Sequence, residues 1–350
     1  TGYTHLMENV GQTSNRGVEL SLTGYIMDRP DFTLNATFNI GRNKNKIDKL
    51  ASGEKEMVLS SGWAGSQLLN SDDYRAYVGG TTGLIYGFVN DGFYTVDDFK
   101  PFDSKSRTWT LKDGVVNSSP LSGDPRPGNA KFKKLTPVDE NSANPYTLTD
   151  DDRTVIGNTT PKFSGGFGLN ATFKGFDVSA FFNFMYDFDV FNANKVMMTT
   201  WASNNYNNFS MDISAAKRWR NFDDMGNEIR YSPEILAEFN KNATMWNPTS
   251  IGRPIAMSYA VEDGSFLRLN TATIGYTLPR AWTNKVGLSR VRFYASGYNL
   301  FTITGYSGYD PEVDIATGLT PNIDNNRYPR SRTYTFGVQS VSYTHLTLPT

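Results

Sequence analysis

The residue types that most often carry chemistry are scarce in this sequence. The chain has 350 residues, no Cys and only two His, His5 and His345, one near each end. The missing Cys excludes a disulfide framework, a thiolate metal site and a cysteine nucleophile. General-base catalysis by His would depend on one of the chain ends. No phosphate-binding glycine loop or nucleophile elbow is present either. We therefore expect a protein that is not an enzyme and that holds no cofactor.

Carboxylates occur in short runs, and none of them has the spacing of a metal site. The longest run is Asp150, Asp151 and Asp152. A tight Ca²⁺ loop needs a Gly at its sharp turn, and this run contains none. The sequence therefore predicts a solvated acidic loop and no bound metal.

Four aromatic rings in one long segment, 189–263, are candidates for ligand binding. They are Trp201, Tyr206, Trp219 and Trp246. Asn and Ser residues surround them, and this mixture suits stacking on sugar faces together with hydrogen bonds to sugar hydroxyls. Long connections are also where binding residues concentrate. The alternative is that the rings pack the segment on itself, around a short helix with Ser232 as N-cap and Pro233 at its first position.

Apolar and polar residues alternate with a period of two through four segments, which predicts β-strands. The apolar positions are Val18, Leu20, Leu22 and Ile26; Phe32, Leu34, Ala36, Phe38 and Ile40; Phe163, Phe167, Leu169, Ala171 and Phe173; and Phe176, Val178, Ala180, Phe182, Phe184 and Tyr186. Weaker alternation predicts three further strands. The seven strands, at 16–27, 31–42, 161–174, 175–188, 264–277, 290–303 and 331–341, should pair antiparallel in sequence order.

The length of the alternation favours strands that cross a membrane. It lasts for roughly the 9–11 residues that a tilted strand needs to cross a bilayer, whereas globular strands usually have about 5–6. Aromatic residues make up 14% of the chain, as in barrels with aromatic girdles. A large soluble β-sandwich is the alternative. In a barrel, the convex, lipid-facing side should show these residues as an exposed apolar patch: Phe32, Leu34, Phe38, Phe167, Leu169, Phe182 and Phe184.

The connections alternate between short and long, as in bacterial outer-membrane barrels. Residues 28–30, 174–175 and 278–289 form the shorter connections, and 43–160, 189–263 and 304–330 form the long ones, expected to be extracellular. Seven strands cannot close a barrel, because an open edge in lipid would leave backbone groups unpaired. We therefore expect an all-β chain that is the C-terminal part of a larger antiparallel transmembrane barrel.

Several motifs, in order along the chain, resemble the SusC/RagA branch of the TonB-dependent receptors. The segment 266–279 contains FLRLN and IGYTLP, 292–301 ends in GYNLF, 305–313 reads GYSGYDPEV and 328–337 reads YPRSRTYTFG. Upstream, 86–92 reads YGFVNDG. Each motif alone is a weak pattern, but the ordered set covers most of the chain.

The resemblance implies a plugged outer-membrane barrel of Gram-negative bacteria that imports glycans or peptides. It also implies a SusD-like surface lipoprotein as a lid and the TonB complex as energy source, the latter acting through parts that this chain lacks. A siderophore receptor of the same architecture and a surface β-sandwich adhesin are the alternatives. The 34 basic and 35 acidic residues nearly cancel, which points away from a nucleic-acid partner. Within this frame, 1–341 is the partial barrel. The segment 342–350 departs from the family's aromatic ending and is expected to be a non-native tail.

Overall fold

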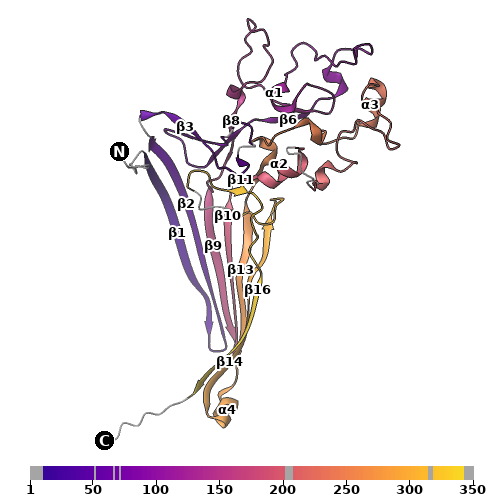
Figure 1. Cartoon of the computed structure of the whole chain (residues 1–350). Helices are drawn as coiled ribbons and strands as arrows, with labels where there is room; N and C mark the ends of the chain where they lie inside the picture. The colour runs from indigo at the N-terminus through magenta and orange to yellow at the C-terminus, as the bar shows by residue number, and fades with distance from the viewer. Residues whose placement is uncertain are drawn as a thin grey trace, which may run out of the picture.

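The chain forms one long sheet with a body of loops at one end (Figure 1). This computed structural model describes residues 11–50, 53–65, 68–70, 72–201, 208–313 and 318–342. We call the described parts of 50–162, 187–265 and 305–332 the loop body. The shorter connections lie at the opposite end of the sheet, so the predicted alternation of short and long connections is confirmed.

Seven antiparallel strands make up the long sheet, and they pair in sequence order. They are β1 (Gln12–Arg29), β2 (Phe32–Lys49), β9 (Phe163–Phe173), β10 (Phe176–Tyr186), β13 (Phe266–Thr277), β14 (Leu288–Thr304) and β16 (Thr333–Ser342). This confirms the predicted strand set and order. It also differs from a β-sandwich, whose Greek-key connections would place strands out of sequence order.

The register of the sheet separates an apolar face from a polar face. One row across six strands is apolar throughout: Leu22, Phe38, Phe167, Phe182, Leu269 and Phe301. A row of the other face is polar across five strands: Asn35, Asn170, Ser179, Thr273 and Ser296. Within this polar row Asn170 Nδ2 donates to Asn35 Oδ1 at 3.1 Å, and the hydroxyls of Thr273 and Ser296 lie 2.8 Å apart.

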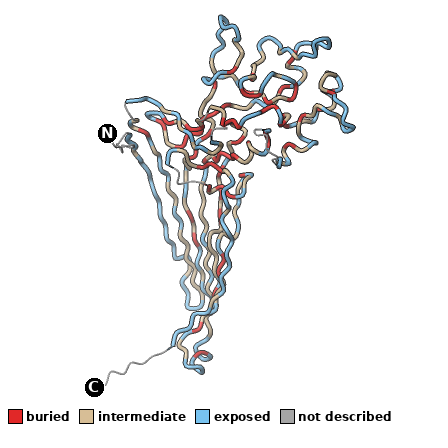
Figure 2. The backbone as a smooth tube through the Cα atoms, in the orientation of Figure 1, coloured by how far each residue is buried: buried red, intermediate tan, exposed pale blue. Residues whose placement is uncertain are grey.

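None of the seven residues expected to face lipid is buried. Phe38 and Leu169 are exposed, and the other five are half-buried. The partial cover comes from neighbouring rings on the same face, such as Phe167 stacked on Phe182 with centroids 4.7 Å apart. Figure 2 shows the sheet in exposed and intermediate colours, with most buried residues in the loop body. The prediction of exposed side chains is therefore confirmed for Phe38 and Leu169, whereas the other five are only half exposed.

The first two strands are longer than the alternation indicated. β1 and β2 continue toward the loop body through polar residues, where their ladder pairs Asn15 with Asn45 and Arg16 with Lys44. Asn45 Nδ2 also donates to Asn15 Oδ1 at 3.0 Å. Alternation ends there because both faces are polar, although the backbone pairing continues.

The shorter connections follow their turn residues. Lys174 and Gly175, between β9 and β10, have φ of +47° and +90°, as a two-residue type I′ hairpin turn requires at both positions. The connection from β13 to β14 contains α4 (Arg280–Thr283) and a 3₁₀ turn (Asn284–Val286). At the chain's end β16 reaches Ser342, which pairs with the strand residue Leu288. Residues 343–350 lie outside the described residues, so the non-native tail stays a prediction.

The loop body has its own small sheets and short helices. Its strands are β3 (Glu56–Leu59), β4 (Tyr74–Tyr77), β5 (Leu84–Gly87), β6 (Asn90–Phe93), β7 (Ala130–Phe132), β8 (Thr154–Asn158), β11 (Asp189–Asn192), β12 (Val261–Asp263) and β15 (Ile323–Asp324). Its α-helices are α1 (Ser119–Ser122), α2 (Ala193–Thr199) and α3 (Pro233–Phe239). Its 3₁₀ turns are Val96–Asp98, Asp150–Asp152, Met211–Ile213, Pro248–Ser250 and Ser258–Ala260. No helix in the described part of the chain is long and apolar enough to span a membrane.

A buried ion cluster joins the loop body to the sheet. Arg268 of β13 is almost fully buried, and its Nη2 lies 2.5 Å from Asp310 Oδ1 and 3.3 Å from Glu312 Oε2. Arg330 Nη2 reaches the same Glu312 at 3.0 Å. The GYSGYDPEV and YPR motifs therefore supply the charges that fix the 305–332 connection on β13, since leaving one such buried charge unpaired is costly.

Candidate ligand-binding site

Trp246 lies in the larger core of the loop body. Only 2% of its surface is exposed, among residues that include Phe132, Phe191 and Ile251. Its Nε1 donates to the carbonyl of Thr199 at 3.2 Å, and its ring meets the ring of Tyr259 edge-on at 4.8 Å. The ring of Trp246 is thus used in packing. This agrees with the alternative that the rings pack the segment on itself.

Trp219 lies in a second, smaller core. Its side chain is 3% exposed and packs with Ile229 and with Leu236 of α3. A Cβ on Gly128, where φ is +91°, would lie 2.1 Å from Trp219 Cδ1, so only Gly fits beneath the ring. α3 begins at Pro233 after Ser232, as predicted, although the Ser232 side chain makes no capping hydrogen bond.

Trp201 is the predicted ring that remains accessible. It is 46% exposed, and its ring centroid lies 5.8 Å from that of Phe209. Both rings line a hollow of about 570 Å³, the aromatic hollow, which an edge of Trp219 also borders. Its further lining residues are Arg218, Arg220, Asn221, Phe222, Asp223, Arg230, Asn247, Pro248 and Thr249. Tyr206 lies outside the described residues.

Backbone hydrogen bonds from the two cores hold the walls of the aromatic hollow. The amide of Trp219 donates to the carbonyl of Met245 at 2.8 Å, and the amide of Asn247 donates to the carbonyl of Gly128 at 2.7 Å. Asn240, at the end of α3, accepts from the amide of Arg220 at 2.7 Å. The buried rings Trp219 and Trp246 therefore position the residues between and beside them, whereas Trp201 stays exposed.

The sequence singled out the four rings by their type and missed Phe209, Phe222 and the arginines of the hollow. Phe209 and Phe222 belong to the same 189–263 segment and are both exposed. Their signal was an aromatic ring beside Ser, Asn or Asp, the signal that marked Trp201. Only the folded segment shows which rings reach the surface.

The acidic run is not the solvated loop that the sequence predicted. Asp150 and Asp151 are exposed, but Asp152 is fully buried. Its carboxylate accepts from the amides of Leu135, Thr136 and Thr149 at 2.8–2.9 Å and from Lys134 Nζ at 3.3 Å. Burial acts to raise the pKa of Asp152, but these hydrogen bonds outweigh it and hold the pKa at about 2. Asp152 thus ties the segment 133–152 together, and the solvated-loop expectation was wrong for this residue.

A second buried carboxylate has the opposite balance. Asp73, beside β4, accepts from the amide and hydroxyl of Ser61 at 2.8 and 2.5 Å. Burial raises the pKa of Asp73 to about 6, against the effect of the Ser61 hydrogen bonds. Among the described residues, no group of three His, Cys, Asp or Glu side chains could hold a metal ion. His5 and His345 both lie outside the described residues.

Comparison with known proteins places the chain beside TonB-dependent receptors. No family model matches the sequence. TonB-dependent receptor P3 of Formosa agariphila is 30% identical over 344 residues, which cover 97% of this chain and 30% of that receptor. TonB-dependent receptor SusC of Bacteroides thetaiotaomicron is 23% identical over 340 residues, which cover 95% of this chain and 27% of SusC.

Solved structures agree on the fold. The structure of the RagAB peptide transporter matches 98% of this chain and 31% of its own matched chain, with a TM-score of 0.62 and 23% identity. The RagAB peptide importer in its closed-closed state gives a TM-score of 0.64. The chain therefore spans about a third of the length of the proteins it matches. The resemblance to SusC/RagA-type TonB-dependent receptors is confirmed over nearly the whole chain. The relatives are named as receptors and transporters, in agreement with the expectation that the protein is not an enzyme.

Proposed function

We propose that this part of a SusC/RagA-type TonB-dependent receptor is the C-terminal wall of an outer-membrane barrel in a Gram-negative bacterium, through which a nutrient is imported. The observation that carries the proposal is the seven-stranded sheet with one uncovered apolar face. Water would make that face unfavourable at about 25 cal/mol per Å², whereas lipid accepts it. The polar face then lines the lumen.

The nutrient we propose is a glycan or a peptide. SusC and the RagAB peptide transporter are both similar to this chain, which supports this class over a siderophore. By the same similarity, a SusD-like surface lipoprotein would close the barrel over the loop body. The TonB complex would supply the energy through parts of the receptor outside this chain.

Two neighbouring residues of β9 test the membrane position. This chain has no Cys, so Leu169→Cys and Asn170→Cys can each be introduced into it within the complete receptor in outer-membrane vesicles. The receptor without either substitution gives the background labelling. Leu169 is on the apolar face and Asn170 on the polar face. We expect a water-soluble maleimide to label Asn170→Cys and to leave Leu169→Cys unlabelled until the protein is denatured. Equal labelling of the two in intact vesicles would contradict a lipid-facing sheet.

Growth tests the transport. A strain lacking the receptor gene should lose growth on one glycan or peptide as sole carbon source, and a strain lacking TonB should show the same loss. A defect only in iron-limited medium would instead identify a siderophore receptor. Loss of surface adhesion without any growth defect would favour the adhesin.

A further inference from the structure

The aromatic hollow adjoins a second hollow, and the two share a wall. The second hollow has a volume of about 470 Å³. Asn221, Arg230, Asn247 and Thr249 line both. Each volume lies within the range of about 300–1,000 Å³ that is usual for ligand pockets. The two hollows therefore lie side by side on the loop body, and we call the pair the double groove.

Aromatic rings occur along both halves of the double groove. Trp201, Phe209 and Phe222 are exposed in the first half. Trp109 and Tyr231 line the second half. The shared wall adds the side-chain amides of Asn221 and Asn247 and the hydroxyl of Thr249. Apolar ring faces beside amides and hydroxyls match the two surfaces of a sugar ring, which has an apolar C–H face and a polar rim.

Guanidinium groups outnumber the free carboxylates of the double groove. Arg107, Arg126 and Arg218 line it, and no carboxylate of the described residues forms an ion pair with any of them. Arg218 Nη1 donates to the carbonyl of Ile213 at 3.0 Å, and the guanidinium of Arg107 lies 5.2 Å from the ring centroid of Tyr231. These cations are thus available to an anionic ligand.

The remaining charges of the double groove largely cancel one another. Arg220 pairs with Asp224 at 2.7 Å, and Arg230 pairs with Glu228. Asp223 Oδ2 accepts from Asn227 Nδ2 at 2.9 Å, and its Oδ1 accepts from two backbone amides. Asp124 is the lining carboxylate without a side-chain partner among the described residues. Asp223 keeps its charge because its hydrogen-bond partners are neutral. The three guanidiniums without an ion pair therefore exceed the two carboxylates, Asp124 and Asp223, by one positive charge.

The backbone around the double groove favours a saccharide over an extended peptide. A peptide that binds by strand addition needs an exposed sheet edge. The lining residues come from turns, bends, isolated β-bridges, α1, α3 and the 3₁₀ turn Pro248–Ser250, and none lies in one of the named strands. Recognition therefore depends on side chains, with rings and planar guanidiniums as the main groups. Arg forks bind carboxylate and related oxyanions in a bidentate manner.

We propose that the double groove binds an acidic oligosaccharide, one whose sugar units carry carboxylate or sulfate groups. Sugar faces stack on Trp201, Phe222 and Tyr231, and Arg107, Arg126 and Arg218 hold the anionic groups. This assignment rests on the proposed import function, since it names the class of nutrient that the same loop body would admit.

The experiment measures binding by calorimetry on the complete receptor in detergent. The ligands are oligogalacturonate, oligomannuronate and a sulfated galactan oligosaccharide, each beside its neutral twin made by carboxyl reduction or desulfation. We expect at least one acidic ligand to bind and its neutral twin to bind at least tenfold more weakly. The carboxyl-reduced and desulfated twins distinguish a uronate from a sulfate ligand.

Two sets of variants locate the bound ligand. The double variant Arg107→Gln/Arg126→Gln and the single variant Trp201→Ala should each weaken binding of the acidic ligand at least tenfold. Lys112→Gln removes an exposed cation of the same loop that lines neither hollow, and it should bind as the native protein does. Protection of Leu169→Cys from the maleimide in each variant, as above, shows that the barrel is assembled.

Three results would overturn the assignment. The neutral twins could bind as tightly as the acidic ligands, or the variants could keep full affinity. A library of peptides could bind where no saccharide does. In each of these cases a TonB-dependent growth defect would leave the import proposal standing. Absence of that growth defect would instead contradict import itself.

Discussion

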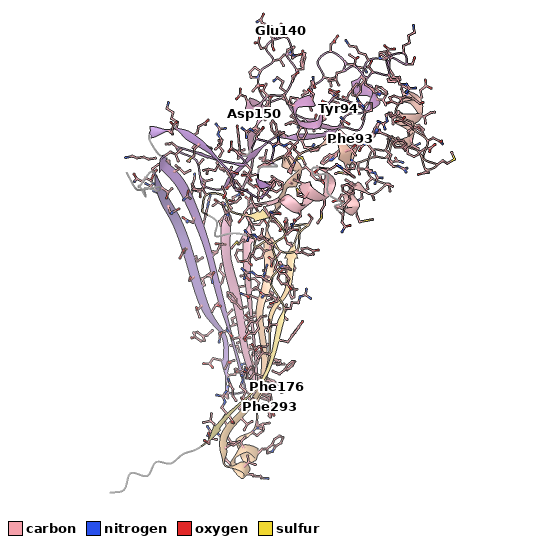
Figure 3. The ribbon with its side chains drawn as sticks, in the orientation of Figure 1. Phe93, Tyr94, Glu140, Asp150, Phe176 and Phe293 are labelled. Atoms are coloured by element: carbon pink, nitrogen blue, oxygen red, sulfur yellow. The ribbon has the colours of Figure 1, made fainter. Side chains whose placement is uncertain are left out.

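The sheet and the loop body place the same kinds of side chain in opposite surroundings. Phe336 of β16 is 80% exposed, whereas Phe132 of β7 is completely buried. Figure 3 shows Phe176 and Phe293 at the far end of the sheet, and Phe93 and Tyr94 within the loop body. Apolar groups avoid water in both regions. The loop body buries them within its own chain. In the sheet they stay exposed, and we propose that lipid covers them.

Polar groups also have different surroundings in the two regions. On the polar face of the sheet they pair across strands, at positions that range from exposed to half-buried. Asp177 of β10, for example, pairs with Arg292 of β14 across Gly275 at 2.5–2.8 Å. In the loop body, Asp73 and Asp152 are buried and need hydrogen bonds from the backbone. In the sheet, the surroundings of a side chain therefore depend on which face it occupies. In the loop body they depend on how far the side chain is buried.

The largest expected effect concerns the stability that the buried core gives to the loop body. Trp246→Ala should destabilise it by about 3–5 kcal/mol, because it removes a buried ring and leaves a cavity. Hydrogen exchange at the amides of Trp219 and Asn247 should report the loss, since both are hydrogen-bonded beside this core. Trp201→Ala, at the exposed ring, should stay within about 0.5 kcal/mol. Equal effects of the two substitutions would contradict the division between packing and accessible rings.

A charge on the apolar face of the sheet should have the next largest effect. Leu169→Arg places a cation where we propose lipid, at a cost of about 2–4 kcal/mol near the middle of a bilayer. The matched control is Asn170→Arg on the polar face, which should cost less than about 1 kcal/mol. Unfolding by urea in phospholipid vesicles measures both. A control as damaging as Leu169→Arg would show that the two faces are not distinguished by lipid.

The pH dependence of the loop body should follow Asp73. Its folded pKa of about 6 lies above its ordinary value of 3.8, so the folded state binds the proton more tightly. Stability therefore falls as pH rises from about 4 to 6 and stays low above 6. Asp73→Asn keeps a neutral partner for Ser61 and should stabilise the loop body by up to about 3 kcal/mol at pH 7.5.

Hydrogen exchange of the Tyr86 amide measures the effect of Asp73→Asn, because that amide donates to the Asp73 carbonyl at 2.8 Å. At pH 4 the variant and the native protein should have equal protection, since the native carboxyl is then neutral. A gain of the same size at both pH values would exclude the titration of Asp73 as its cause.

The smallest expected effect tests the polar rows of the sheet. Asn35→Ala removes the hydrogen bond from Asn170, which lies on an exposed face, and should cost no more than about 0.5–1.5 kcal/mol. Urea unfolding of the assembled receptor measures this. Asn141→Ala, at an exposed position in the loop body, is the control and should have no effect. A loss above 3 kcal/mol for Asn35→Ala would indicate a row that is buried, for example by a plug.

The sequence alone determined the sheet, because one local rule governs it. In a strand, successive side chains point to opposite faces, so Phe32, Leu34 and Phe38 had to share a face with their partners on β9 once one register was chosen. Lys174-Gly175 likewise fixed its hairpin turn through positive φ. The sequence did not predict the polar ends of β1 and β2, because they show no alternation although their backbones pair.

The loop body was decided by tertiary structure. Trp201, Trp219 and Trp246 all lie in one segment without periodicity, and the burial of the last two depends on partners such as Gly128 and Thr199. Asp152 differs from Asp150 only because Leu135 and Thr136 direct their amides toward it. Burial in the loop body depends on contacts between residues that lie far apart in the sequence. A periodic pattern of apolar residues cannot predict such contacts. The double groove exists for the same reason, since its walls come from segments that are joined only in the folded protein.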